Sequence, residues 1–182
     1  VEFVLGDVTT LPQFHDQQFD LITCTNSAHH LPTLKALQEM LQEMVRLMDE
    51  QGTAFVMDLT RLKTFNCVQK YVQLMGQEYL SHGLEKLYED FRNSMYAAWT
   101  PAELCSAVPS AKTHQWHHFA MVPLPVNQFL FAKTRSWQKN RPDTAFQWPD
   151  SRPPVREDLQ IDYKRYRQAI LTSCRWFRHD LN

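Results

Sequence analysis

Short apolar runs separated by polar, turn-forming residues fill the first third of the chain. Residues 1–5 (VEFVL), 19–24 (FDLITC) and 53–59 (TAFVMDL) are rich in β-branched and aromatic side chains, and they predict buried strands. Between the last two runs, residues 31–48 carry apolar side chains at helical spacing, and Gly52 marks the predicted helix exit. This order of strand, strand, helix and strand favours a parallel sheet that is buried on both faces.

The middle of the chain is predicted to be helical. Residues 65–91 place apolar side chains on one helix face, and Gly76 and Gly83 are expected to break or bend that helix. A new helix start follows at residues 100–103 (TPAE), where Thr, Pro and Glu occupy the N-cap, first and third positions. We expect this second helix to run to about residue 108.

The chain divides into two parts near Trp137. Residues 113–121 and 127–133 are predicted to form a final antiparallel strand pair, which closes an α/β domain over residues 1–138. Residues 139–182 form a proline-containing linker and an amphipathic C-terminal helix, whose apolar stripe contains Leu159, Tyr163, Tyr166, Ile170, Cys174 and Phe177. This helix would pack on its own domain, bind a partner or a second copy, or lie on a membrane surface.

Composition narrows the class of protein. The chain has 182 residues, 43% of them hydrophobic, and a net charge of −1. These values fit a globular protein and favour neither a nucleic-acid nor a membrane partner. The four cysteines form no CxxC pair and no apolar run reaches the length of a membrane span, so we expect free thiols and a cytoplasmic location. Only four glycines are present, although a nucleotide-binding loop normally needs several.

Three segments in order, VEFVLGDVTTLP, FDLITCTNSAHHL and MVRLMDEQGTAFVMDL, carry a resemblance to a known family. Over about residues 1–135 the chain resembles the second half of a class I S-adenosylmethionine-dependent methyltransferase, closest to the branch that includes the ubiquinone and menaquinone biosynthesis enzymes. The resemblance implies a partial Rossmann-like methyltransferase sheet, from strand 3 to strand 7. It also implies S-adenosylmethionine as cofactor and a small molecule as methyl acceptor.

One part of the family pattern has no counterpart in this sequence. The resemblance implies a glycine-rich cofactor loop and an acidic residue at the end of strand 2, both upstream of residues 1–5, and the sequence contains neither. We therefore expect a truncated half with an incomplete cofactor site, which would need its missing N-terminal half or a homodimer partner. The alternative is a degenerate, non-enzymatic module that self-associates or binds a protein.

Four residues are candidates for cofactor binding. Asp7 ends the first predicted strand, where open α/β sheets bind ligands, and a carboxylate there can accept a hydrogen bond from an adenine amino group. The resemblance implies that role for Asp7 and implies that the Val8 backbone meets the ring; a turn-forming Asp beside Gly6 is the alternative. Thr25 and Asn26 follow the next strand, where the resemblance implies contact with the amino-acid end of the cofactor and a helix-start cap is the alternative.

Two histidines and two charged residues are candidates for substrate binding. The resemblance implies that His29 or His30 lines the cleft, and His30 is the candidate general base. Asp58 ends a strand and Arg61 follows it, so both are candidates to face the substrate, with a solvated loop as the alternative. No metal site is expected, because adjacent histidines point about 100° apart on a helix. The segment 114–118 (HQWHH) lacks a zinc spacing and is interpreted as an edge strand with surface histidines.

Overall fold

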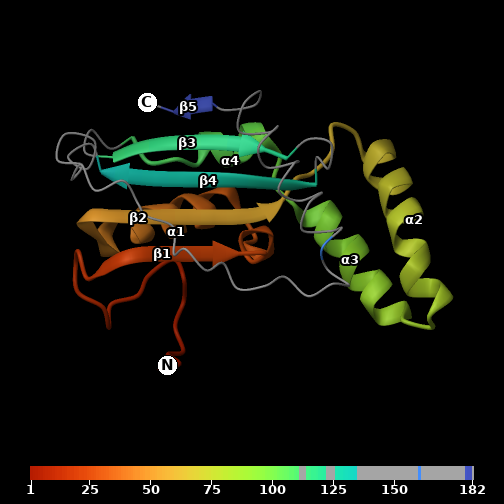
Figure 1. The fold of residues 1–182 in the computed structure, drawn as a ribbon, viewed down its shortest axis with the longest axis horizontal. Coiled ribbons are helices and arrows are strands. Elements are labelled where there is room, and N and C mark those ends of the chain that lie inside the picture. Colours follow the sequence, from red (N-terminus) through yellow and green to blue (C-terminus); the bar gives the residue numbers. More distant parts are fainter. Residues whose placement is uncertain (111–113, 122–125, 135–159, 161–178, 182) are drawn as a thin grey trace.

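The computed structural model describes residues 1–110, 114–121, 126–134, 160 and 179–181. It shows a mixed α/β fold built on one sheet whose strand order is β1-β2-β4-β3-β5 (Figure 1). The strands are β1 (Phe19–Thr25), β2 (Met48–Leu59), β3 (His114–Ala120), β4 (Asn127–Thr134) and β5 (His179–Leu181). Strands β1 and β2 are parallel, whereas β4 is antiparallel to both of its neighbours and β5 is antiparallel to β3.

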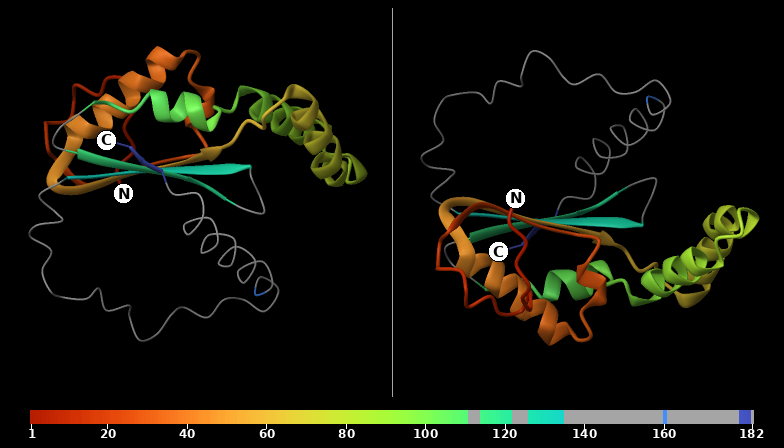
Figure 2. Two further views of the ribbon diagram at one scale, coloured as in Figure 1. Left: turned by 90° about the horizontal axis from the view of Figure 1, so that it is seen from above. Right: turned by 90° about the horizontal axis from the view of Figure 1, so that it is seen from below.

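Helix α1 (Leu34–Leu47) connects the two parallel strands. It begins at Thr33, whose hydroxyl accepts a hydrogen bond from the Ala36 N–H. Helices α1 and α4 (Pro101–Ser106) lie on the same face of the sheet (Figure 2). The predicted strand–helix–strand unit is therefore confirmed, with the helix starting after Pro32 rather than at it.

The main core lies between this sheet face and the two helices. Alternate residues of β2, Ala54 and Val56, are fully buried there. They share one cluster with side chains of α1, α4, β3 and β4, which include Leu37, Met40, Leu41, Leu104, Trp116, Leu130 and Ala132. Burial of each large aliphatic side chain contributes about 1.5–3 kcal/mol, so this cluster is the principal support of the sheet.

The opposite sheet face carries an aromatic cluster. Phe119 and Phe129 stack with ring centroids 4.8 Å apart, and Phe55 and Phe131 approach to 4.7 Å. These side chains come from β2, β3 and β4. Odd-numbered residues of β2, such as Phe55, point away from the α1 face, because successive strand residues alternate between the two faces.

A helical hairpin leaves the sheet after β2. Helices α2 (Phe65–Ser81) and α3 (Glu85–Ala97) pack against each other and project beyond the strand ends (Figures 1 and 2). The turn between them contains Gly83 at φ +68°, a conformation that favours glycine. Gly76 lies inside α2, where a Cβ atom would come within 2.6 Å of the Tyr88 ring, so its missing side chain permits close helix packing.

The loop before β1 is fastened to α1 by one guanidinium. Arg46 donates to the carbonyl oxygens of Leu11 and Phe14 and to the carboxylates of Asp16 and Glu43. Glu43 also accepts from the Leu11 N–H at 2.7 Å. The hydrogen bond from Arg46 lowers the pKa of the Glu43 carboxyl below its usual range.

The expected first strand is not formed. Residues 1–5 pair with no described strand, and Val1, Phe3 and Leu5 are almost fully exposed. The prediction of a strand 3 was therefore wrong for these residues, because an apolar run becomes a strand only when a partner edge is available. The parallel pairing of the strands that flank the first helix is confirmed, but the sheet also contains antiparallel strands, and its burial on both faces was wrong, since Leu21 of β1 is 62% exposed.

Three further expectations about local structure need correction. Helix α2 runs through Gly76 without a break, and Gly52 lies inside β2 rather than at the helix exit. His117 and His118 are buried rather than on the surface, and β3 is not an edge strand, because β5 pairs with it. The capping box at Thr100 and the antiparallel pair β3–β4 are confirmed.

The C-terminal tail lies mostly outside the described residues. The predicted linker and amphipathic helix over residues 139–182, and the turn at residues 123–125, fall there, apart from residue 160 and β5. Within the described part of the chain, no helix combines the length and the apolar character that crossing a membrane would require.

Candidate functional site

The candidate site lies where the parallel strands β1 and β2 end. At this edge, the Asn26 N–H donates to the Met57 carbonyl oxygen at 2.8 Å, which joins the two strand ends. Asn26 has φ 50°, a left-handed conformation that Asn tolerates better than most residues. Ser27 closes the turn, since its hydroxyl donates to the Thr25 carbonyl oxygen at 2.9 Å. Thr25 and Asn26 are exposed at the strand end where ligands of open α/β sheets bind.

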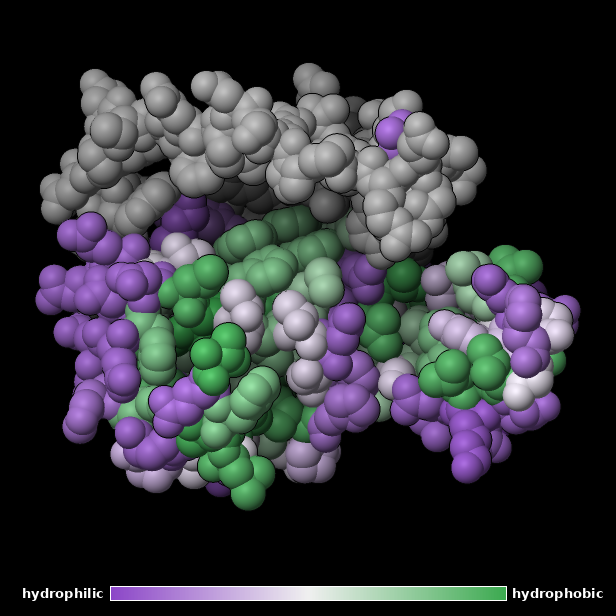
Figure 3. All heavy atoms as spheres, turned by 60° about the horizontal axis from the view of Figure 1, so that its bottom comes forward, coloured by the Kyte–Doolittle hydropathy of each residue, from purple (hydrophilic) through white to green (hydrophobic). Residues whose placement is uncertain are grey.

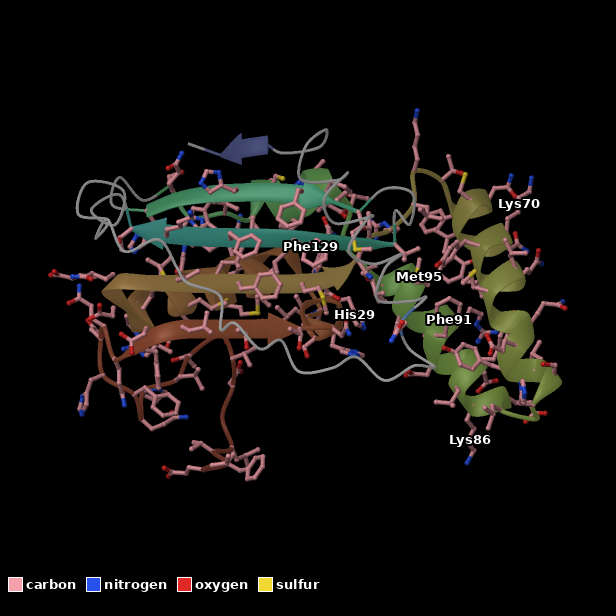
Figure 4. All side chains as sticks on the ribbon, viewed as in Figure 1. His29, Lys70, Lys86, Phe91, Met95 and Phe129 are labelled. Atoms are coloured by element: carbon pink, nitrogen blue, oxygen red, sulfur yellow. The ribbon has the colours of Figure 1, made fainter. Side chains whose placement is uncertain are left out.

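A buried histidine–aspartate pair forms the centre of this edge. His29 lies in the short helix η1 (Ala28–His30) after β1, and Asp58 lies at the end of β2. The His29 Nδ1 atom is 2.6 Å from Asp58 Oδ1, and the His29 backbone N–H donates to Asp58 Oδ2 at 2.6 Å. Both side chains are at most 4% exposed. Figure 4 shows His29 at the end of the sheet from which the α2–α3 hairpin projects.

Further hydrogen bonds fix the segments on which this pair lies. Asp58 Oδ1 also accepts from the Leu59 N–H at 2.8 Å. The Trp99 indole N–H, from the segment that follows α3, donates to the Ala28 carbonyl oxygen at 2.9 Å. The buried Gln128 amide group donates to the carbonyl oxygens of Leu59 and Trp99, at 3.1 and 2.7 Å. The strand end, the return from α3 and η1 are therefore held in one network.

The charge of Asp58 affects a nearby thiol. Burial, and to a lesser degree the Asp58 charge, raise the pKa of Cys24 to about 11. Cys24 packs beside Met40, with the two sulfur atoms 3.9 Å apart. This thiol therefore remains protonated at neutral pH and is a packing residue rather than a nucleophile.

His30 and Arg61 have different surroundings from the buried pair. The His30 side chain is exposed, and its ring lies against the ring of His29 with centroids 4.1 Å apart. Arg61 donates to both carboxylate oxygens of Glu103 at 2.6 Å. Burial acts to raise the pKa of Glu103, but hydrogen bonds from Thr100 and the Arg61 charge lower it overall. The Arg61 side chain is therefore bound to the start of α4 rather than to the residues at the sheet edge.

Asp7 and Val8 lie in a separate, exposed turn. Asp7 Oδ1 accepts from both the backbone N–H and the hydroxyl of Thr9, at 2.9 and 2.8 Å. The backbone bond is the larger cause of a lowered pKa at Asp7. Val8 is 48% exposed. No hydrogen bond among the described residues joins this turn to Asn26, His29 or Asp58.

The exposed polar groups suit part of an adenosyl cofactor. Asp7 Oδ2 and the exposed Thr25–Asn26 turn offer acceptors and donors of the kind that an adenine ring and an amino-acid group need. The chain has no cluster of glycines that would let the backbone approach a cofactor closely, because its four glycines lie apart from one another. Gly52 and Gly76 pack inside β2 and α2, Gly83 joins α2 to α3, and Gly6 lies beside the exposed turn at Gln13.

The sequence named most of the residues at this edge but missed their pairing. His29 and Asp58 are 29 positions apart, and the signal that could have joined them was that each follows a parallel strand end. Trp99 and Gln128 were missed, since nothing in the local pattern distinguishes them from core residues. Thr60 was missed too. Its buried hydroxyl oxygen has no hydrogen-bond partner among the described residues, a feature that only the structure reveals.

Comparison with known proteins gives a partial match. Residues 1–56 match the model of a family described as a methyltransferase domain. No curated protein matches the sequence significantly. Among solved structures, a protein from Pyrococcus horikoshii OT3 is similar at 13% identity, over 74% of this chain and 60% of its own, with a TM-score of 0.45. A SAM-dependent methyltransferase from Methanosarcina mazei is similar at 15% identity, over 73% and 66%, with a TM-score of 0.47. The chain thus spans less than two thirds of the length of these two proteins.

Proposed function

We propose that the protein to which this chain belongs transfers a methyl group from S-adenosylmethionine to a small molecule. The observation that carries this proposal is the methyltransferase-domain match over residues 1–56. That range contains Asp7, Thr25, Asn26 and His29. It ends inside β2, two residues before Asp58, so the matched segment and the candidate edge overlap in the structure.

In this proposal the chain supplies one side of the site. Asp7 and Val8 meet the adenine, and Thr25 and Asn26 meet the amino-acid end of the cofactor. His29 and His30 lie toward the substrate, while Asp58 and Arg61 hold the surrounding segments through His29 and Glu103. When bound, the cofactor supplies an activated methyl group, so the protein mainly aligns the acceptor and excludes water. The free thiols of Cys24, Cys67 and Cys105 are in keeping with a cytoplasmic site of action.

We further propose that the cofactor site is completed by residues that this chain does not contain. Two observations support this proposal. Gly52, Gly76 and Gly83 have other places in the fold and Gly6 stands alone beside Asp7, so no glycine-rich loop faces the candidate edge. The β1 strand pairs on one side with β2 and on its other side with no described strand, while its Leu21 side chain is 62% exposed. An unpaired strand edge of this kind is a surface on which further strands can add.

Titration calorimetry tests both proposals. We expect this chain alone to show no saturable binding of S-adenosylmethionine, and the full-length protein to bind it in the micromolar range. Micromolar binding by the chain alone would contradict the incomplete site. Absence of binding by the full-length protein, with its fold verified by circular dichroism, would contradict the methyltransferase proposal itself.

A second candidate function is a non-enzymatic module that self-associates. Val1, Phe3, Leu5 and Leu21 are strongly exposed, and Figure 3 shows hydrophobic side chains gathered on the side of the molecule that carries β1. Exposed apolar surface next to an open strand edge favours association. Light scattering after size exclusion distinguishes the two candidates: a dimer that persists on dilution favours the module, and a monomer argues against it.

A further inference from the structure

His29 forms two hydrogen bonds to one carboxylate, one from its backbone and one from its ring. Its backbone N–H and its Nδ1 atom reach the two different oxygens of Asp58, each at 2.6 Å. A carboxylate only accepts hydrogen bonds, so the Nδ1 atom carries the proton in this pair. The other ring nitrogen, Nε2, is then an acceptor with a free electron pair whenever the ring is neutral.

The Nε2 atom is the part of the pair that is left for a ligand. It makes no hydrogen bond to any residue that the structure describes. His29 as a whole is only 5% exposed, but its Nε2 atom is not among the fully enclosed atoms that lack a hydrogen-bond partner. The ring lies after β1 and beside the end of β2, at the edge where ligands of parallel sheets bind.

We propose that His29 is the proton acceptor of the reaction, that Asp58 is its positioning residue, and that the methyl acceptor is a neutral O–H or N–H nucleophile. This inference rests on the proposed methyl transfer. The oxygen or nitrogen of the acceptor attacks the methyl carbon, the bond from that carbon to sulfur breaks with its electron pair going to sulfur, and the acceptor proton moves to Nε2. The resulting imidazolium then lies against the Asp58 carboxylate, which favours its positive charge.

The neighbouring histidine lacks these features. His30 is exposed, and no described carboxylate forms an ion pair with it. Its ring contacts the His29 ring, at a centroid distance of 4.1 Å. An imidazole without an orienting partner is free to rotate, and it gains no stabilisation when it takes a proton. The sequence favoured His30 as the base, whereas the geometry points to His29.

The first experiment compares two acceptors that differ in their need for a base. Phenol must lose a proton during transfer, whereas thiophenol is already ionised in slightly alkaline buffer. In the full-length protein, we expect His29→Asn to lower transfer to phenol about 100-fold or more, the usual contribution of a general base. Transfer to thiophenol should change less than about threefold. The Asn amide can still donate to Asp58. His15→Asn, at an exposed histidine in the loop before β1, is the matched control and should leave both rates unchanged.

A purely structural role predicts a different result. If His29 only supports the fold, His29→Asn lowers both rates in parallel, and that outcome overturns the inference. Wild-type transfer to thiophenol without transfer to phenol also overturns it. Should His29→Asn fail to fold, Asp58→Asn serves in its place, because it keeps the imidazole and removes the carboxylate charge and one acceptor oxygen. That variant should lower phenol transfer about tenfold while thiophenol transfer persists.

A second measurement needs no turnover, and it separates this inference from the methyltransferase proposal. Diethyl pyrocarbonate acylates the free nitrogen of a neutral imidazole. In the His30→Asn background, where the label on this segment is unambiguous, we expect peptide mapping to show acylation of His29. Its rate should be below that of the exposed His15, because the His29 side chain is 4% exposed. If wild-type protein methylates neither acceptor, the methyl-transfer proposal loses support. Labelling then decides the state of Nε2, and an unlabelled His29 overturns its assignment as a base.

Discussion

Replacing Asp58 with alanine should loosen the candidate site more than any other single polar substitution at this edge. The Asp58 carboxylate accepts three hydrogen bonds, from the His29 backbone, the His29 ring and the Leu59 backbone, at 2.6, 2.6 and 2.8 Å. The side chain is 1% exposed, so water has little access to the donors that would remain. The substitution therefore leaves up to three donors without an acceptor.

The size of the effect follows from the cost of an unsatisfied buried donor. That cost is about 1–3 kcal/mol for each group, and the small cavity left by the missing carboxylate admits water that offsets part of it. We expect Asp58→Ala to lower the free energy of unfolding by about 3 kcal/mol. Asp58→Asn keeps one acceptor oxygen for two of the three donors, and it should lower that free energy by about 1–2 kcal/mol.

Urea denaturation followed by circular dichroism measures both changes. The matched control is Asp49→Ala, also on β2, because Asp49 accepts only the exposed Gln51 N–H and its loss should cost less than about 0.5 kcal/mol. If Asp58→Ala and Asp49→Ala destabilise the chain equally, the carboxylate does not anchor η1, and its positioning role fails with it.

Three other predictions concern packing, pH and thiol chemistry. Gly76→Ala should destabilise the chain by about 1–2 kcal/mol, because the added methyl meets the Tyr88 ring. In a Tyr88→Ala background the same substitution should stabilise the chain by about 1 kcal/mol. A stabilising effect in both backgrounds contradicts the close approach. Glu43 has a pKa below its ordinary 4.5 because of its guanidinium partner, so the stability it contributes is present above pH 4.5 and is lost as pH falls through the lower folded value. Urea midpoints of wild type and Glu43→Gln should therefore converge in acid, and a constant difference argues against the ion pair. Iodoacetamide should alkylate the exposed Cys67 well before Cys24, whose pKa is raised to about 11, as peptide mapping would show; equal rates contradict the burial of Cys24.

Much of the central fold follows from local patterns in the sequence. The strand–helix–strand unit from β1 to β2 was predicted from apolar spacing, and the capping box at Thr100 from three residue types. Both succeed because strand alternation and helix capping depend on neighbours in the chain. Residues 1–5 fail for the opposite reason, since a strand also needs an edge to pair with, and that edge is set by tertiary structure.

The candidate site was predictable in its location but not in its internal roles. Strand ends of a parallel pair meet at one edge, which is where the structure places Asn26, His29 and Asp58, although the sequence analysis did not pair His29 with Asp58. The choice between His29 and His30 depends on which ring η1 turns inward, and adjacent positions give the sequence no means to decide it. Arg61 looked equivalent to its neighbours, but its bond to Glu103 depends on where α4 begins.

The two ends of the α2–α3 hairpin are tied together at the edge of the sheet. The chain leaves the sheet after Leu59 and returns at Trp99, and the Gln128 amide donates to the carbonyl oxygens of both. The Arg61 N–H also donates to the Trp99 oxygen, at 3.1 Å. Closing a loop at its base makes the entropic cost of what lies beyond depend only weakly on its length. Changes in the length of the hairpin should therefore leave the register of the sheet unchanged, so residues 62–97 are a natural point for loop engineering.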